Sequence, residues 1–277
     1  MAGLAAKLAT RTGLLLVVVL YTLYAVGPMV WLAAMSLRTT NEINLDHYGL
    51  PTVFHWSKYW QAWSTSTYET YFWNSVIVVG ASVTVLTLVG SMAAFCLARY
   101  RFPGNRIVFL VLFSTILLPP QITIISLFQI MVEYQLFNSR LGLVLVYVGT
   151  QLPLTIYLLE GFFRRLPQDL FDAAKVDGYS DFEIFWRIAF PMAAPAIVTT
   201  VIVNFILLWN EFLYAVVLIT DDKARTLPLG VQKFMGDQFS DIGMIATGAM
   251  ISILPVIIVY AFFSEKIIQG MTAGAVK

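Results

Sequence analysis

The sequence is short of charged residues. Only 12% of its 277 residues are Asp, Glu, Lys or Arg, whereas 59% are hydrophobic. Soluble domains carry about 25% charged residues, so this chain has too little charge to cover a soluble surface of its size. We therefore expect much of its surface to face lipid. The net charge of +1 lacks the strongly basic balance of a nucleic-acid-binding protein, so we expect no nucleic-acid partner.

Cysteine and histidine are scarce, and one phosphate-binding motif is absent. The single cysteine, Cys96, excludes a disulfide framework within the chain. The two histidines, His47 and His55, both fall in a predicted loop, so the sequence predicts no metal site. The sequence contains no G-x-x-x-x-G-K-S/T phosphate loop. We therefore do not expect this chain to power itself with ATP by that route.

Six long apolar runs are present instead. A bilayer core about 30 Å thick is crossed by a helix of about 20 apolar residues, and each run is close to that length or longer. The runs are continuously apolar rather than alternating, which favours helices over a barrel of strands. We predict an all-α membrane protein with one integral domain over residues 1–277 and spans at about 12–35, 74–97, 107–132, 141–163, 194–219 and 245–263.

The distribution of Lys and Arg predicts the orientation, because these residues are enriched in cytoplasmic segments. With a cytoplasmic N-terminus, 11 of the 17 Lys and Arg residues lie inside, and the stretch "RYRFPGNR" alone holds three arginines. Both termini and the loop at about 164–191 are therefore predicted to be cytoplasmic. The inside residues are Lys7, Arg11, Arg99, Arg101, Arg106, Arg164, Arg165, Lys175, Arg187, Lys266 and Lys277.

The predicted outer loop at residues 36–72 is long and rich in Trp and Tyr. Aromatic side chains favour the membrane–water interface, so an interfacial belt is one interpretation. A docking surface for an external partner is the other, and the sequence leaves both open.

Prolines interrupt two of the predicted spans. Pro119 and Pro120 lie midway through the third span, and Pro153 lies in the fourth. A proline removes a backbone hydrogen bond and bends a helix, and in a membrane the protein must satisfy the carbonyl groups that this frees. Gln121 follows the proline pair and is a candidate for this role. Kinks that aid packing and kinks that line a path are both consistent with the sequence.

A few polar side chains are predicted to lie inside spans. Glu211, near the outer end of the fifth span in "WNEF", is the ionisable residue among them, and Asn204 precedes it. A carboxylate at the bilayer centre costs about 2.5–3.5 kcal/mol, so we expect this face to turn towards protein or water. Either a hydrogen-bond network between helices or a substrate path fits the pattern. The candidate path residues are Gln121, Asn204, Trp209, Asn210 and Glu211.

The segment "FDAAKVDGYSDFEIFWRIAFP" (residues 171–191) concentrates charge between two apolar runs. Pro167 is suited to the first turn of a helix, and Gly178 is suited to its end. Ser180 and Glu183 have the spacing of a capping box that begins a second helix. We therefore predict a cytoplasmic docking element made of two short helices around a glycine corner.

Each of these two helices has a distinct predicted face. In the first, four residues fall at i, i+3, i+4 and i+7, and its two alanines leave room for another surface to approach. In the second, an apolar stripe is expected. The first face consists of Leu170, Ala173, Ala174 and Asp177, and the second of Phe182, Phe185, Trp186 and Ala189.

The same segment resembles a known motif. "DAAKVDG", followed after nine residues by "IAFP", resembles the EAA motif of the permeases of ATP-binding-cassette (ABC) importers. Asp172 stands where the motif has glutamate, Phe190 where it has leucine, and Tyr179 departs from the small residue usual after the glycine. "LARYRFPG", "LLPPQ", "WNEF" and the tail "GMTAGAVK" resemble the carbohydrate-uptake, maltose-type branch. Within that branch, the chain is similar to the shorter, second permease subunit.

The resemblance implies a permease subunit of an importer for a sugar or sugar-like solute in a bacterial or archaeal plasma membrane. It implies three protein partners: a second permease in a heterodimer, an ATPase dimer and an extracytoplasmic solute-binding protein. ATP and Mg would be bound by the ATPase, so this chain is expected to hold no catalytic residue, metal or cofactor. The residues implied in ATPase coupling are Asp172, Ala173, Ala174, Asp177, Gly178 and Tyr179.

An ion-coupled transporter or channel that works without an ATPase is the competing class. Such a protein tends to need a series of ionisable residues across its spans. Glu211 is the residue that this interpretation would rely on.

Overall fold

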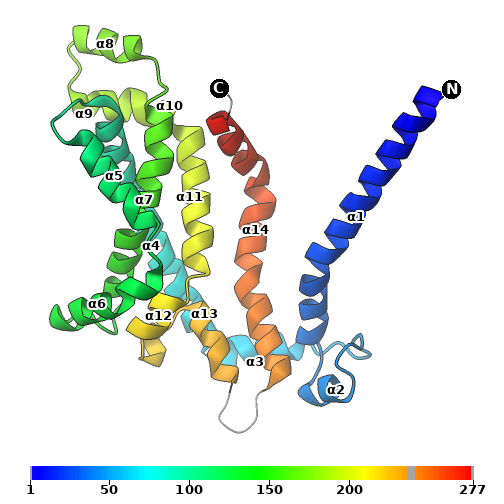
Figure 1. Cartoon of the computed structure of the whole chain (residues 1–277). Coiled ribbons are helices and arrows are strands. Elements are labelled where there is room, and N and C mark those ends of the chain that lie inside the picture. Colours follow the sequence, from blue (N-terminus) through cyan, green and yellow to red (C-terminus); the bar gives the residue numbers. More distant parts are fainter. Residues whose placement is uncertain (1, 66, 236–240, 276–277) are drawn as a thin grey trace. The chain divides into compact units, whose positions relative to one another are not determined.

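The computed structural model describes residues 2–65, 67–235 and 241–275, with side chains over 11–64, 67–235 and 241–265. Every regular element in these ranges is helical (Figure 1), which confirms the predicted fold class. The side chains of Lys7, Lys266 and the tail "GMTAGAVK", with Lys277, lie outside the described residues. The elements are α1 (Ala2–Ser36), α2 (Thr40–Leu45), α3 (Ser57–Thr65), α4 (Tyr68–Arg99), α5 (Asn105–Ile116), α6 (Pro120–Glu133), α7 (Arg140–Phe163), α8 (Gln168–Val176), α9 (Asp181–Ile184), a π-helix (Phe185–Ala189), α10 (Phe190–Met192), α11 (Ala194–Trp209), α12 (Leu213–Leu218), a 3-10 turn (Asp222–Ala224), α13 (Leu227–Gly230), a second 3-10 turn (Val231–Phe234) and α14 (Ile242–Ala275).

Four helices are long and apolar enough to cross a membrane by themselves. They are α4, α7, the Arg11–Ser36 part of α1 and the Ile242–Glu265 part of α14. Two pairs of helices pass the same test together, each bent at a short break: α5 with α6, and Asp181–Met192 with α11. The described chain therefore has four candidate spans, or up to six if each bent pair is one span.

The third predicted span, residues 107–132, is two helices rather than one. α5 and α6 meet at 101°. Pro119 has an extended conformation (φ −62°, ψ 136°), and Pro120 is the first residue of α6. Proline lacks a backbone N–H and disfavours a helical conformation in the residue before it, so the pair ends one helix and begins the next. The fifth predicted span, residues 194–219, is likewise divided, because α11 ends at Trp209 and α12 begins at Leu213.

The chain divides into two compact units. Unit 1 comprises residues 1–68 and 230–253, and unit 2 comprises residues 69–229 and 254–277. The expectation of one domain over residues 1–277 stays a prediction.

A buried arginine organises the loop that follows α1 in unit 1. Arg38 is 4% exposed, and its guanidinium donates hydrogen bonds to the backbone oxygens of Glu42 (2.6 Å), Asp46 (2.7 Å) and Gly49 (2.8 Å). Lys58 Nζ donates to the backbone oxygen of Arg38 (2.6 Å), and burial lowers the pKa of Lys58. The loop exposes several aromatic side chains, so the interfacial belt and the docking surface both stay predictions. These side chains are Tyr48, Phe54, Trp56 and Trp60.

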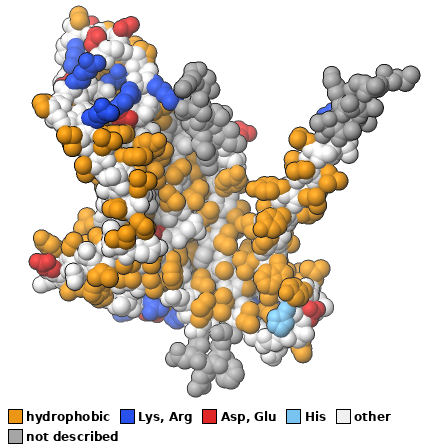
Figure 2. Space-filling view, in the orientation of Figure 1, with side chains coloured by type: hydrophobic (Ala, Val, Ile, Leu, Met, Phe, Trp, Pro, Cys, Tyr) orange, Lys and Arg blue, Asp and Glu red, His pale blue; other side chains and the backbone are white. Residues whose placement is uncertain are grey.

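The end of unit 2 that contains residues 164–191 is rich in charged residues. Helices α8 and α9 lie together at one end, beyond the end of α7 (Figure 1). Figure 2 shows Lys and Arg side chains gathered at that end and hydrophobic side chains along the flanks. This distribution supports a cytoplasmic position for the end that carries α8 and α9.

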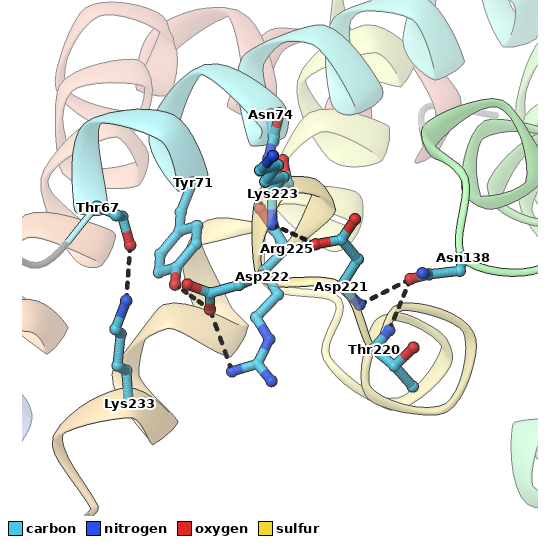
Figure 3. A network of polar contacts seen from close by, with 10 residues as sticks. All are labelled: Thr67, Tyr71, Asn74, Asn138, Thr220, Asp221, Asp222, Lys223, Arg225 and Lys233. Atoms are coloured by element: carbon cyan, nitrogen blue, oxygen red, sulfur yellow. Dashed lines mark hydrogen bonds and ion pairs between the residues drawn. The ribbon is translucent and has the colours of Figure 1, made fainter.

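Polar side chains fasten the loop after α12 to α4 and to the start of α7 in unit 2 (Figure 3). Asn74 Nδ2 donates to the backbone oxygens of Lys223 (2.8 Å) and Arg225 (2.9 Å). Asn138 Oδ1 accepts the backbone N–H groups of residues 220 and 221, at 2.9 and 2.8 Å. A few side-chain amides thus satisfy the backbone of a segment that lacks regular hydrogen bonding.

Candidate functional site

The first candidate site is the loop at residues 164–191, and its glycine corner forms as predicted. Gly178 has φ +85°, a left-handed conformation that favours glycine. The Gly178 N–H donates to Lys175 O (3.1 Å), and the Tyr179 N–H donates to Ala174 O (3.0 Å). These two bonds make a Schellman motif, which satisfies the last carbonyl groups of α8. The corner is therefore fixed by its own backbone.

The second helix of the loop begins with the predicted capping box. Ser180 Oγ accepts the Glu183 N–H (3.3 Å), and the Glu183 carboxylate accepts the Ser180 N–H (3.1 Å). The apolar stripe is only partly correct. Phe185 and Ala189, at the two ends of a π-helix, are buried, whereas Phe182, in α9 before it, is 63% exposed.

The predicted outward face of the first helix, α8, contains one residue too many. Ala174 is 4% exposed and packs with the buried cluster of unit 2, so it does not face outward with Ala173. Phe171, one turn earlier, is buried beside it. The reason is that α8 must cover the core with one side, and i, i+3 neighbours share that side. The members of the implied coupling set that remain exposed are Asp172, Ala173, Asp177, Gly178 and Tyr179.

Four phenylalanines join this loop to the bundle. Phe95 of α4 lies 6.0 Å from Phe171, 5.4 Å from Phe185 and 5.7 Å from Phe163, measured between ring centroids. All four are buried. Burying one such ring stabilises a protein by about 1.5–3 kcal/mol, and contacts at these distances add an aromatic preference. The loop is therefore packed against α4 and α7 as part of one core.

Arg99, at the end of α4, holds the loop by polar contacts that the sequence did not suggest. Its guanidinium donates to Leu166 O (2.6 Å) and to Gln168 Oε1 (3.1 Å), and it lies 4.0 Å from the centroid of the Phe171 ring. From the sequence, Arg99 was used only as one of the Lys and Arg residues that predict the orientation of the chain in the membrane. Its contacts join residues about 70 positions apart, so no local pattern could have revealed them.

Tyr100 adds a second contact between the end of α4 and the loop. Burial raises the pKa of Tyr100 to about 12, and a hydrogen bond with Asp181 of α9 adds to the shift. Its ring packs edge-on against Phe95, with centroids 6.1 Å apart. Tyr100 therefore keeps its proton under ordinary conditions and is available as a donor to α9.

The second candidate site is the break between α11 and α12, where Glu211 turns towards protein. Its carboxylate accepts the Tyr147 hydroxyl of α7 (2.8 Å) and the backbone N–H groups of Tyr214 (2.7 Å) and Ala215 (3.2 Å). A carboxylate at the start of a helix complements its unpaired N–H groups and its dipole. Of the two alternatives for Glu211, the geometry favours the hydrogen-bond network.

Asn204 and Trp209 are also engaged in packing. Asn204 is fully buried and donates through Nδ2 to Thr155 Oγ1 of α7 (2.8 Å). Trp209 is 3% exposed, and its ring centroid lies 5.3 Å from that of Phe205 and 5.9 Å from that of Phe72. Both residues therefore join α11 to its neighbours.

Gln121 and Asn210 are exposed, whereas Asn204 and Trp209 are buried, so the five candidate path residues do not share one environment. The Asn210 amide donates to Ile206 O (2.8 Å) in the helix that precedes it. A groove of about 700 Å³ lies among α5, α6, α7, α11 and α12, and none of the five candidates is among its lining residues. No pattern in the sequence indicated its polar lining, which consists of Thr115, Thr123, Thr150, Gln151 and Tyr214.

A second carboxylate within a span was also missed. Glu160 lies near the end of α7, is 5% exposed and forms an ion pair with Arg164, one helical turn later. Within the described residues, no group of three or more His, Cys, Asp or Glu side chains is placed to hold a metal ion. The buried carboxylates of unit 2 are thus engaged by neighbours within the protein.

Comparisons with known proteins agree with the resemblance. The model of the family described as "Binding-protein-dependent transport system inner membrane component" matches residues 86–271. The diacetylchitobiose uptake system permease protein NgcG of Streptomyces coelicolor is 35% identical over 258 residues, covering 92% of this chain and 85% of the relative. The trehalose transport system permease protein SugB of Mycobacterium tuberculosis is 35% identical over 257 residues, covering 92% and 93%.

A solved structure shares the fold. One chain in a crystal structure of a bacterial ABC transporter, involved in the import of the acidic polysaccharide alginate, superposes with a TM-score of 0.82. The match has 21% sequence identity and covers 94% of this chain and 97% of that chain. The likeness extends over nearly all of both chains.

We predict that Glu211→Gln lowers the free energy of unfolding by about 1–3 kcal/mol, because an amide cannot accept at both of its polar atoms as the carboxylate does. Tyr147→Phe should cost less, and the double variant should cost less than the sum. Thermal unfolding of the purified protein measures this, with the exposed Glu133→Gln as the control. An unchanged Tm for Glu211→Gln would contradict the network.

We predict that Arg99→Met loosens the 164–191 loop. The change keeps the apolar stem but removes two hydrogen bonds and the contact with Phe171, at a cost of about 2 kcal/mol, which increases opening by about thirtyfold. Hydrogen exchange over residues 168–189 measures it. Arg101→Met, at an exposed position two residues further on, is the control. Equal exchange in both variants would show that Arg99 does not hold the loop.

Proposed function

This chain belongs to the family of binding-protein-dependent transport system inner membrane components, and on that premise we propose its specific role. It is the membrane permease subunit of an ABC importer, and it forms half of the path through which a sugar or oligosaccharide crosses. The match of the family model over residues 86–271 carries this conclusion.

The substrate class rests on what the relatives carry. Two of the relatives that are 35% identical are named for diacetylchitobiose and trehalose uptake. Both substrates are disaccharides, and a sugar needs hydroxyl and amide groups to replace its water. In the groove described above, Thr150 and Gln151 offer such groups, and most of the other lining residues are apolar. We therefore propose that this groove contributes to the path.

The earlier path candidates fall into two groups. Asn204, Trp209 and Glu211 act in the proposed path by fixing the shape of α11, since each contacts neighbouring helices. Gln121 and Asn210 flank the two helix breaks and are exposed. These two are proposed to meet the solute directly.

The loop at residues 164–191 is proposed to dock into a groove of an ATPase subunit. Its outward side combines acidic groups with apolar ones, among them Val176, which is 88% exposed. Asp172, Ala173, Asp177, Gly178 and Tyr179 would contact the ATPase. Ala174 would act from the inner side, by keeping α8 close to the core.

Three partners complete the proposed assembly. A second permease pairs with this chain to close the path, and an extracytoplasmic solute-binding protein delivers the solute. An ATPase dimer binds ATP and Mg and drives the cycle. Closure of the ATPase dimer would move the 164–191 loop, and the packed phenylalanines would pass that movement to α4 and α7.

An ion-coupled transporter is the weaker candidate. It would rely on carboxylates that exchange protons or ions along a path. Glu211 and Glu160 are both engaged, by Tyr147 with backbone N–H groups and by Arg164, respectively. Uptake by vesicles that contain this chain without an ATPase would favour that class.

We predict that Gly178→Val abolishes uptake while the chain still inserts. A Cβ at this position meets no atom within 4 Å, so the effect comes from the backbone, where φ is +85°. A left-handed conformation costs an L-residue about 1–2 kcal/mol, and more for a β-branched one. Gly178→Asn is the matched control, because asparagine tolerates this region. Uptake and solute-stimulated ATPase activity of the assembled transporter are measured, and wild-type rates in Gly178→Val would rule out the corner's role.

We predict that Asp172→Lys weakens retention of the ATPase while pairing with the second permease persists. Asp172 is exposed, and its carboxylate accepts a hydrogen bond from Gln168 Nε2 of the same helix at 3.1 Å. We therefore expect the chain's own fold to tolerate the change. Co-purification of both partners is measured. Asp169→Lys, the same charge change one turn earlier, is the control. If both variants lose the co-purifying ATPase subunits equally, α8 acts through its overall charge and not through Asp172.

A further inference from the structure

A basic pocket of about 620 Å³ lies between the end of α4 and the start of α5, in unit 2. Its lining includes Arg101, Arg106 and Arg164, and none of the residues that line it is acidic. The positive-inside distribution places this end of the molecule at the cytoplasmic border of the membrane. The pocket is separate from the proposed path and from the outward side of α8.

The turn that forms the pocket is held in place by its own residues. Asn105 Nδ2 donates to Leu97 O (3.0 Å) and to Tyr100 O (2.8 Å), which ties the start of α5 to the end of α4. Gly104 has φ +88° and allows the chain to reverse. The pocket therefore exists without a partner to shape it.

Two of the three arginines are available to a ligand. None of the ion pairs in the described part of the chain uses Arg101 or Arg106, and both side chains are exposed. Arg164 is partly neutralised by Glu160. The start of α5 lines the same pocket and has no side-chain cap, so it adds the partial positive charge of a helix N-terminus. The pocket thus carries excess positive charge.

We propose that this pocket binds a phosphate group. The guanidinium group matches phosphate oxygens with paired N–H donors and remains charged. A phosphodiester of an anionic lipid headgroup and a dissolved phosphate offer the same chemistry. Lipid is the favoured source, because Ile107, Leu110 and Val111 are exposed on one face of α5 and provide a track for acyl chains below the headgroup.

The test compares anionic with zwitterionic lipid on the assembled transporter. Native mass spectrometry measures how many molecules of phosphatidylglycerol or phosphatidylcholine the purified complex retains. Each arginine should contribute about fivefold to retention of the anionic lipid, so Arg101→Gln/Arg106→Gln should reduce it about 25-fold. Arg11→Gln removes a positive charge that is distant in sequence from the pocket, and it should change retention of the anionic lipid little. Arg101→Lys/Arg106→Lys keeps the charge and should retain most of the preference.

Calorimetry with inorganic phosphate distinguishes the two sources. Preferential retention of phosphatidylglycerol that the glutamine pair removes, with no measurable phosphate binding, supports a lipid site. Phosphate binding that the same pair removes, without lipid preference, supports a phosphate site filled from solution. If the glutamine pair folds, as its elution volume would show, and changes neither measurement, the pocket does not bind phosphate.

Discussion

The break between α11 and α12 depends on one carboxylate. A chain surrounded by lipid must satisfy its own backbone hydrogen bonds, so a helix can stop inside the membrane only where a side chain takes over. Glu211 does this with both oxygens, because it accepts two N–H groups of α12 and the hydroxyl of Tyr147. The same carboxylate thus caps the start of α12 and binds α7 beside it, next to the groove that Tyr214 lines.

The 164–191 loop is stiff, which suits the coupling role proposed for it. Its stiffness has two sources. The Schellman motif and the capping box fix the corner internally. Phe171 and Phe185 then bury the inner side of the loop against Phe95, while Arg99 closes the junction with hydrogen bonds. The loop is therefore packed directly against α4, as the proposed coupling role would require.

The sequence predicted those features that depend on neighbouring residues. The corner at Gly178 and the cap at Ser180 follow from local backbone chemistry, and the family follows from a motif that contains them. The sequence did not predict the burial of Ala174 or the exposure of Phe182, since these depend on how α8 and α9 meet the core. Arg99 and the groove were missed because their partners are distant in sequence. The roles of the coupling and path residues stay predictions.

Several buried or half-buried charged side chains bind backbone groups of the chain. Arg38, Lys58 and Arg99 direct their charge mainly at backbone oxygens, and Glu211 directs its charge at backbone N–H groups. Backbone groups at helix ends and in loops carry partial charges that are otherwise costly to bury. Arg38 binds three of them and Glu211 two, whereas the buried Glu160 is paired with Arg164. Arg101 and Arg106 are exposed and belong to none of the ion pairs among the described residues, which is consistent with the phosphate site proposed for their pocket.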